Sequence, residues 1–169
     1  AENLPKRWFI GEEHTKMKLT IPSKAEKILR ILEENGYEAY VVGGCVRDSI
    51  MGRIPDDWDI TTSAQPEQVK ALFHRTVDTG LQHGTVTVLI EKEGFEVTTY
   101  RVDGDYEDGR HPKEVLFTSS LEEDLKRRDF TINAMAYHPD KGLVDLFHGM
   151  EDMRNKVIRC VGSPRERFR

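Results

Sequence analysis

Apolar side chains first recur at helical spacing after residue 22. Four of them lie three or four positions apart, as on one face of a helix: Ala25, Ile28, Leu29 and Leu32. Residues 23–26 (SKAE) have the pattern of a capping box, and Gly36 is placed to end the helix. Residues 1–22 show no clear period. The pattern therefore predicts an N-terminal arm followed by a helix over residues 23–35.

Two short β-rich runs then flank a pair of glycines. Residues 37–42 are largely apolar and predict a strand. Residues 43–44 (Gly-Gly) predict a turn into a short helix that is closed by Gly52. After a polar turn, residues 57–61 predict a second strand, in which alternate side chains face opposite sides.

The rest of the chain mixes helical and extended patterns. The first part predicts a helix that begins near residues 63–66, with Val69, Leu72 and Phe73 inward, and then a hairpin of residues 85–91 and 95–102 joined by residues 92–94. The second part predicts a polar loop at 103–112, a short edge strand at 115–118, a helix from Ser119 or Ser120 to Arg128 that continues over 131–137, and extended runs at 143–147 and 157–161. This order predicts an α+β or mixed α/β domain, with a mixed sheet of about five strands flanked by helices.

The composition is that of a soluble globular protein. The 169 residues are 37% hydrophobic and 33% charged, and no apolar run or signal peptide indicates a membrane. Cys45 and Cys160 lack metal-ligand spacing, so we expect both to be reduced in a cytoplasmic protein. A net charge of −5 argues against binding nucleic acid by bulk attraction alone, although the arginine-rich tail is either a solvated face or a nucleic-acid contact.

The glycine pair and the acids that follow it carry the clearest chemical signal. If Asp57 and Asp59 lie on one strand, their carboxylates project together while Trp58 faces a core. Two neighbouring carboxylates repel each other unless a cation or a proton neutralises them, and oxygen ligands of this kind suit Mg²⁺. The Gly43-Gly44 turn lets the backbone approach a phosphate. Together these features predict phosphoryl or nucleotidyl transfer.

A two-metal site needs a further ligand from another strand. Glu96 is the best candidate because it lies on the polar face of the predicted hairpin, although a glutamate that only faces solvent is an equal alternative. Glu91, Glu93 and Asp103 are its competitors.

A second polar cluster follows at a predicted helix end. Arg127 and Arg128 can bind phosphate oxygens through bidentate hydrogen bonds, and Asp129 can accept a hydrogen bond from a ribose hydroxyl. Asn133 would share a helix face with Asp129 if the helix is continuous. The alternative is a set of cations that only complements the helix dipole.

Four segments in this order resemble one family: GGCVRD (43–48), DDWDITT (56–62), EVTTYR (96–101) and LKRRDFTINAMA (125–136). They look like the head and neck of the tRNA nucleotidyltransferase/poly(A) polymerase family, and most of all like the bacterial class II CCA-adding enzymes. The resemblance implies a fold similar to the DNA polymerase beta palm. It also implies template-independent addition of CMP and AMP to tRNA 3′ ends, from CTP and ATP.

The resemblance also implies roles for individual residues. Asp57 and Asp59 would hold catalytic Mg²⁺ ions, with Glu96 as the third carboxylate. Contacts to the triphosphate would come from Gly43, Gly44 and Arg47, and contacts to the phosphate and ribose of the nucleotide from Arg127, Arg128 and Asp129. Segment 103–112 resembles the flexible loop that is associated with completing CCA.

The resemblance divides the chain into an arm (1–22), a nucleotidyltransferase head (23–148) and the start of a neck (149–169). In the family, the base is selected by an acid and an arginine on a helix just beyond a stretch like residues 164–169. We therefore expect base selection and the tRNA-holding parts on a longer parent chain. Three alternatives stay open: a poly(A) polymerase or an enzyme that adds only A or CC, an inactive module that binds Mg²⁺ and a nucleoside triphosphate, and a structural RNA-associated domain.

Overall fold

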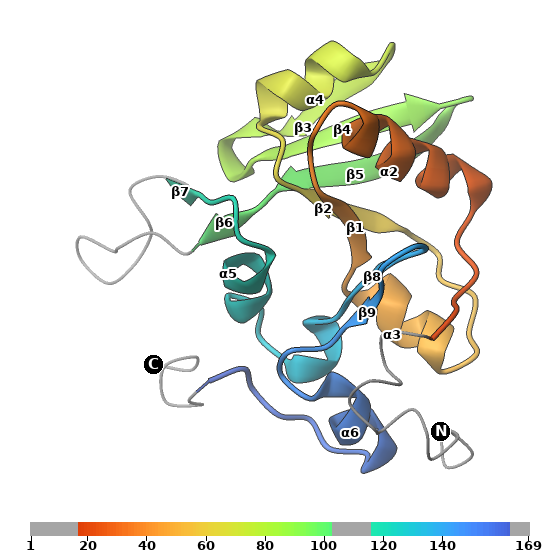
Figure 1. The fold of residues 1–169 in the computed structure, drawn as a ribbon, viewed down its shortest axis with the longest axis vertical. Coiled ribbons are helices and arrows are strands. Elements are labelled where there is room, and N and C mark those ends of the chain that lie inside the picture. Colours follow the sequence, from red (N-terminus) through yellow and green to blue (C-terminus); the bar gives the residue numbers. More distant parts are fainter. Residues whose placement is uncertain (1–16, 103–115, 163–169) are drawn as a thin grey trace.

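The structure, a computed structural model, describes residues 17–102 and 116–162 and is built around a mixed β-sheet (Figure 1). The seven strands of this sheet run in the order β3-β4-β5-β2-β1-β8-β9. Strands β2 and β5 are parallel, and the other neighbouring pairs are antiparallel. The strands are β1 (Ala39–Val42), β2 (Asp59–Thr62), β3 (Thr76–Gly80), β4 (Thr85–Ile90), β5 (Glu93–Thr99), β8 (Ala136–His138) and β9 (Gly142–Val144). A separate two-stranded sheet contains β6 (Arg101–Val102) and β7 (Leu116–Phe117).

The helices lie on both faces of the sheet. In the described residues the α-helices are α2 (Ser23–Glu34), α3 (Gly44–Ile50), α4 (Pro66–Leu72), α5 (Leu121–Lys126) and α6 (Gly149–Arg154). Helices α2 and α4 contact each other and cover one face, whereas α5 packs on the opposite face (Figure 1). No described helix is long and apolar enough to cross a membrane.

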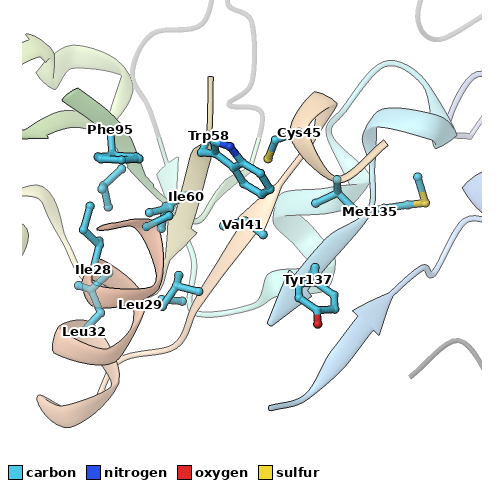
Figure 2. Packing of buried hydrophobic residues seen from close by; sticks show 14 of the residues in the cluster. Ile28, Leu29, Leu32, Val41, Cys45, Trp58, Ile60, Phe95, Met135 and Tyr137 are labelled. Carbon is cyan, nitrogen blue, oxygen red and sulfur yellow. The ribbon is translucent and has the colours of Figure 1, made fainter. Parts of the chain in front are cut away.

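The main hydrophobic core lies between the sheet and α2. Because successive strand residues face opposite sides, Val41, Ile60 and Phe95 point to the same face. They form one buried cluster with Ile28 and Leu29 of α2, as Figure 2 shows. Each fully buried aliphatic side chain of this kind contributes on the order of 2 kcal/mol relative to an exposed one. This packing holds β1, β2 and β5 as a rigid support for the other sheet face.

Within residues 17–102 and 116–162, helices cover the opposite face of the sheet over only part of its width. Tyr40, Val42 and Ala136 pack there in a smaller cluster with Leu125 of α5. Farther along, the same face carries the exposed side chain of Glu96 on β5. Polar groups on this uncovered part can therefore meet a ligand.

Most elements expected from the sequence are confirmed. The helix over 23–35, the strand at 37–42, the helix after the glycine pair, the hairpin and the edge strand correspond to α2, β1, α3, β4–β5 and β7. Ser119 and Ser120 were the two candidates for the N-cap of α5, and the structure shows that Ser120 is the N-cap. Its Oγ accepts a hydrogen bond from the Glu123 N–H at 3.2 Å. An α+β fold with a mixed sheet is thus confirmed.

The sheet is larger than the expected five strands, and one expected helix is wrong. Residues 131–137 form a 3-10 helix (Thr131–Asn133) followed by strand β8. Met135 and Tyr137 enter the main core, while Ala134 and Ala136 enter the smaller cluster. A strand that is buried on both faces has a continuous apolar run without alternation, which is why it resembled a helix.

Other local expectations also need correction. The run at 157–161 is not a strand, because only an isolated bridge joins Phe130 and Cys160. The hairpin turn is Glu91-Lys92, whose two positive φ angles match a two-residue loop, and Glu93 already lies in β5. The capping box expected at residues 23–26 is absent: Pro22 is the N-cap of α2 and no side chain caps it.

Helix α6 was not expected from the sequence, and neither was strand β3, where most side chains are exposed and no apolar alternation marks the strand. Some expectations lie outside the described residues. These are the arm up to residue 16, the loop at 103–112, the start of the edge strand at residue 115 and the tail from residue 163.

Candidate active site

The register of two parallel strands brings Asp59 and Glu96 side by side. Asp59 on β2 is the direct partner of Glu96 on β5, so both carboxylates lie on the same face of the sheet, the one that α5 covers only in part. Asp57 precedes β2, so the expected strand at 57–61 is corrected to Asp59–Thr62. Nevertheless, all three acids line one cavity of about 380 Å³ together with Trp58, Thr87 and Gly94. Trp58 itself is buried in the main core, as the alternation predicted (Figure 2).

The three acids repel one another. Partial desolvation raises the pKa of Asp59, and the neighbouring Glu96 and Asp57 raise it further. Among the described residues, Arg128 lowers this pKa, but it does not reverse the shift. The cavity therefore holds more negative charge than its protein surroundings neutralise. Three carboxylates with unmet charge form an oxygen donor set that fits a divalent cation such as Mg²⁺.

The glycine turn lies next to these acids, because Val42 at the end of β1 pairs with Asp59. Gly43 has φ +86°, a backbone conformation that side chains rarely permit, so the turn requires glycine. A Cβ atom added at Gly43 would lie 3.6 Å from Nη1 of Arg128, and one at Gly44 would lie 3.2 Å from Nη2 of Arg47. The turn thus places backbone without side chains close to the guanidinium groups of Arg128 and Arg47.

Arg47 is oriented by two polar neighbours. Its Nη1 donates to Oδ1 of Asn133 at 2.6 Å, and its Nε donates to Oδ1 of Asp48 at 3.1 Å. Since the helix expected at 131–137 is absent, Asn133 does not share a helix face with Asp129. The structure instead joins Asn133 to Arg47, which lies 86 positions away in the sequence.

Arg127 and Arg128 follow the end of α5 and converge on one carboxylate. Nη2 of Arg128 lies 3.3 Å from Oδ2 of Asp124, and Nε of Arg127 lies 3.5 Å from its Oδ1. Burial lowers the pKa of Arg128, while Asp124 opposes this shift. Asp129 is exposed.

Asp124 was missed by the sequence reasoning. The signal that could have found it is its spacing, because an acid three and four positions before two arginines can pair with both on one helical turn. Its burial, however, depends on packing against distant strands.

A second group of acids lies elsewhere, where α2 meets β8 and the turn that follows it. Ligand atoms of Glu33, His138 and Asp140 lie within 4.8 Å of one another. Here, however, the guanidinium of Arg30 donates to both oxygens of Asp140 and lies 3.6 Å from Glu33. The His138 Nε2 atom is 2.9 Å from Oε2 of Glu33, and Lys141 is 4.0 Å from the same oxygen. Protein cations therefore already neutralise this group, which fits an ion network better than a metal site.

Comparisons with known proteins point to one family. The poly A polymerase head domain family matches residues 39–159. The CCA-adding enzyme of Leuconostoc mesenteroides subsp. mesenteroides is 58% identical over 144 residues, which are 85% of this chain and 36% of that protein. The chain thus spans little more than a third of the length of this relative.

Solved structures agree with this result. The Bacillus stearothermophilus CCA-adding enzyme in complex with CTP matches with a TM-score of 0.80 and 45% identity, over 88% of this chain and 36% of that one. A tRNA nucleotidyltransferase complexed with a primer tRNA and an incoming ATP analog matches with a TM-score of 0.60 and 34% identity, over 80% and 39%. The fold is therefore the DNA polymerase beta-like nucleotidyltransferase fold.

Proposed function

The chain belongs to the poly(A) polymerase head domain family, and from this premise we propose that it is the catalytic head of a CCA-adding tRNA nucleotidyltransferase. The proposed reaction adds CMP and AMP from CTP and ATP to the 3′ end of a tRNA. The observation that carries the proposal is the register of Asp59 and Glu96, with Asp57 in the same cavity. The names of the similar proteins support the choice of substrates.

In the proposed site, Asp57, Asp59 and Glu96 hold Mg²⁺. Bound Mg²⁺ would supply activation of the 3′-hydroxyl and stabilisation of the pyrophosphate leaving group. Binding and orientation of the nucleotide are then left to the side chains and backbone of the protein. The raised pKa of Asp59 is consistent with a carboxylate that gains a cation on substrate binding.

The groups around the glycine turn bind the nucleotide in this proposal. Gly43 and Gly44 leave room for the triphosphate, and Arg47 and Arg128 offer guanidinium groups on either side of the turn. Arg127 adds a further guanidinium to the phosphate contacts. The side chains of Asp129 and Asn133 are the candidates for contacts to the ribose, with Asn133 also fixing Arg47.

The test is incorporation of single nucleotides by the full-length protein on tRNA that ends before CCA. We expect addition of CMP twice and then of AMP. Runs of AMP alone would indicate a poly(A) polymerase, and addition of only A or only CC would indicate a restricted enzyme. Binding of Mg²⁺ and nucleotide without any product would instead favour an inactive binding module.

A single substitution tests the assignment of the metal ligands. Asp57→Ala should abolish incorporation, because it removes one of three carboxylates that face the same cavity. Asp78→Ala is the matched control: it removes an acid on β3 whose partner is Lys70, away from the cavity. Unchanged CTP incorporation by Asp57→Ala would contradict the assignment.

A further inference from the structure

Asp124 is a fully buried carboxylate that joins three separate segments. Its Oδ2 accepts a hydrogen bond from the Thr61 hydroxyl on β2 at 3.1 Å. Its Oδ1 accepts one from the Arg101 backbone N–H on β6, also at 3.1 Å. The same two oxygens face Arg128 and Arg127. A buried carboxylate is stable only when charges and donors surround it in this way.

The contact to Thr61 links the carboxylate of Asp124 to strand β2, which carries the candidate metal ligand Asp59. Thr61 lies two positions after Asp59 on β2, so the two side chains share one face of the sheet. One oxygen of Asp124 thus accepts hydrogen bonds from β2 and from Arg128 together. The position of the Arg128 guanidinium, beside the Gly43 turn, is therefore tied to the position of Asp59.

We propose that Asp124 is a positioning residue of this site: by bonding Thr61, it holds Arg128, and with it Arg127, where they meet the phosphates of the incoming nucleotide. The inference rests on the proposed function. Asp124 itself touches no substrate. It acts through the arginines, so its loss should weaken nucleotide binding more than it slows the chemical step.

The alternative is a buried ion pair that stabilises the fold and nothing else. Both roles predict a loss of stability on substitution, so the melting temperature does not separate them. The two roles differ in whether the effects of substituting Asp124 and Arg128 on nucleotide binding depend on each other. If Asp124 acts through Arg128, its substitution should have no further effect on nucleotide binding once the Arg128 guanidinium is gone.

The experiment is a double-mutant cycle in the full-length protein, with KM for CTP and kcat as readouts. Asp124→Asn should raise KM about tenfold with a smaller change in kcat, as expected for loss of a charged hydrogen bond. Arg128→Ala should raise KM at least as much. The double variant should match Arg128→Ala within about twofold.

Thr61→Val keeps the test valid if Asp124→Asn does not fold. It removes only the buried hydroxyl that bonds Asp124, and it should raise KM about threefold, as expected for loss of one neutral hydrogen bond. The control is Thr99→Val on the neighbouring strand β5. Thr99 is equally buried, but its hydroxyl donates to the carbonyl of Ala64, so KM should stay unchanged.

Two results would overturn the inference. In the first, the increases in KM caused by Asp124→Asn and by Arg128→Ala multiply in the double variant, which would mean that Asp124 has only a structural role. The same conclusion follows if Thr61→Val and Thr99→Val change KM alike. Failure of the proposed function is separate, because the wild-type protein would then not add CMP twice and then AMP to the tRNA.

Discussion

Two groups of side chains in this protein each bring acids together but have opposite electrostatics. In the cavity, partial burial raises the pKa of Asp59, and the neighbouring carboxylates of Glu96 and Asp57 raise it further. Beside α2, the hydrogen bonds of Arg30 lower the pKa of Asp140. The difference shows that clustered acids do not by themselves indicate a metal site. What matters is whether the protein already supplies the opposite charge.

The same contrast explains where each group lies. The acids of the cavity lie on the part of the sheet face that none of the described helices covers, so a ligand can reach them. The other group ties α2 to β8 and the turn after it, and His138 is fully buried within it. Unmet charge at an open surface favours ligand binding, whereas balanced charge between elements favours structure.

The largest expected effect comes from matched glutamates, one from each group. Glu96→Gln removes one charge from the cavity and should lower nucleotide incorporation at least about a hundredfold, because the metal loses a ligand. Glu33→Gln removes one charge from the balanced group and should leave incorporation within about twofold of wild type. Single-turnover assays on both variants check this pair. Equal losses would remove the functional distinction between the two groups.

Binding of Mg²⁺ with nucleotide should sharpen the comparison in a second way. A ligand at a hundred times its Kd stabilises a protein by about 2.7 kcal/mol, so the wild-type melting temperature should rise by several degrees. Asp59→Asn should lose this rise, while Asp140→Asn should keep it. Thermal unfolding with and without Mg²⁺ and CTP measures both. A rise that Asp140→Asn abolishes and Asp59→Asn retains would move the metal to the other group.

The smallest expected effect is on the stability of the unliganded protein, and its sign differs between the groups. The raised pKa of Asp59 means that the folded state binds the proton more tightly than the unfolded chain. Ionisation of Asp59 therefore opposes folding as the pH rises. Asp59→Asn should be more stable than wild type at neutral pH, by less than about 1 kcal/mol because solvent screens the group, and the difference should vanish in acid.

Asp140 should behave in the opposite way. Its pKa is lowered by Arg30, so its contribution to stability is present above the unfolded-state pKa and is lost as the pH falls through the folded-state pKa. Asp140→Asn should therefore be less stable than wild type at neutral pH and equal to it in acid. Urea unfolding from neutral to acidic pH measures both variants. If both variants were more stable than wild type at neutral pH, or both less stable, the electrostatic contrast would be refuted.

Much of the fold was predictable because its signals are local. The spacing of Ile28, Leu29 and Leu32 predicted α2, and the glycine pair predicted the turn into α3. The alternation around Trp58 correctly predicted its burial. Strand β8 was missed because both of its faces are buried, so its sequence lacks the alternation that marks a half-exposed strand.

For the candidate site, the sequence by itself determined which groups are present: the carboxylates Asp57, Asp59 and Glu96, and arginines near a glycine turn. Only the tertiary structure decided their partners. The β2–β5 register placed Glu96 against Asp59, 37 positions away, and packing of α5 placed Asp124 under Arg128 and beside Thr61. It also brought Arg30 of α2 against Asp140, 110 positions away in the sequence. The physical reason is that register and charge balance arise from contacts between residues far apart in the chain, which local spacing does not encode.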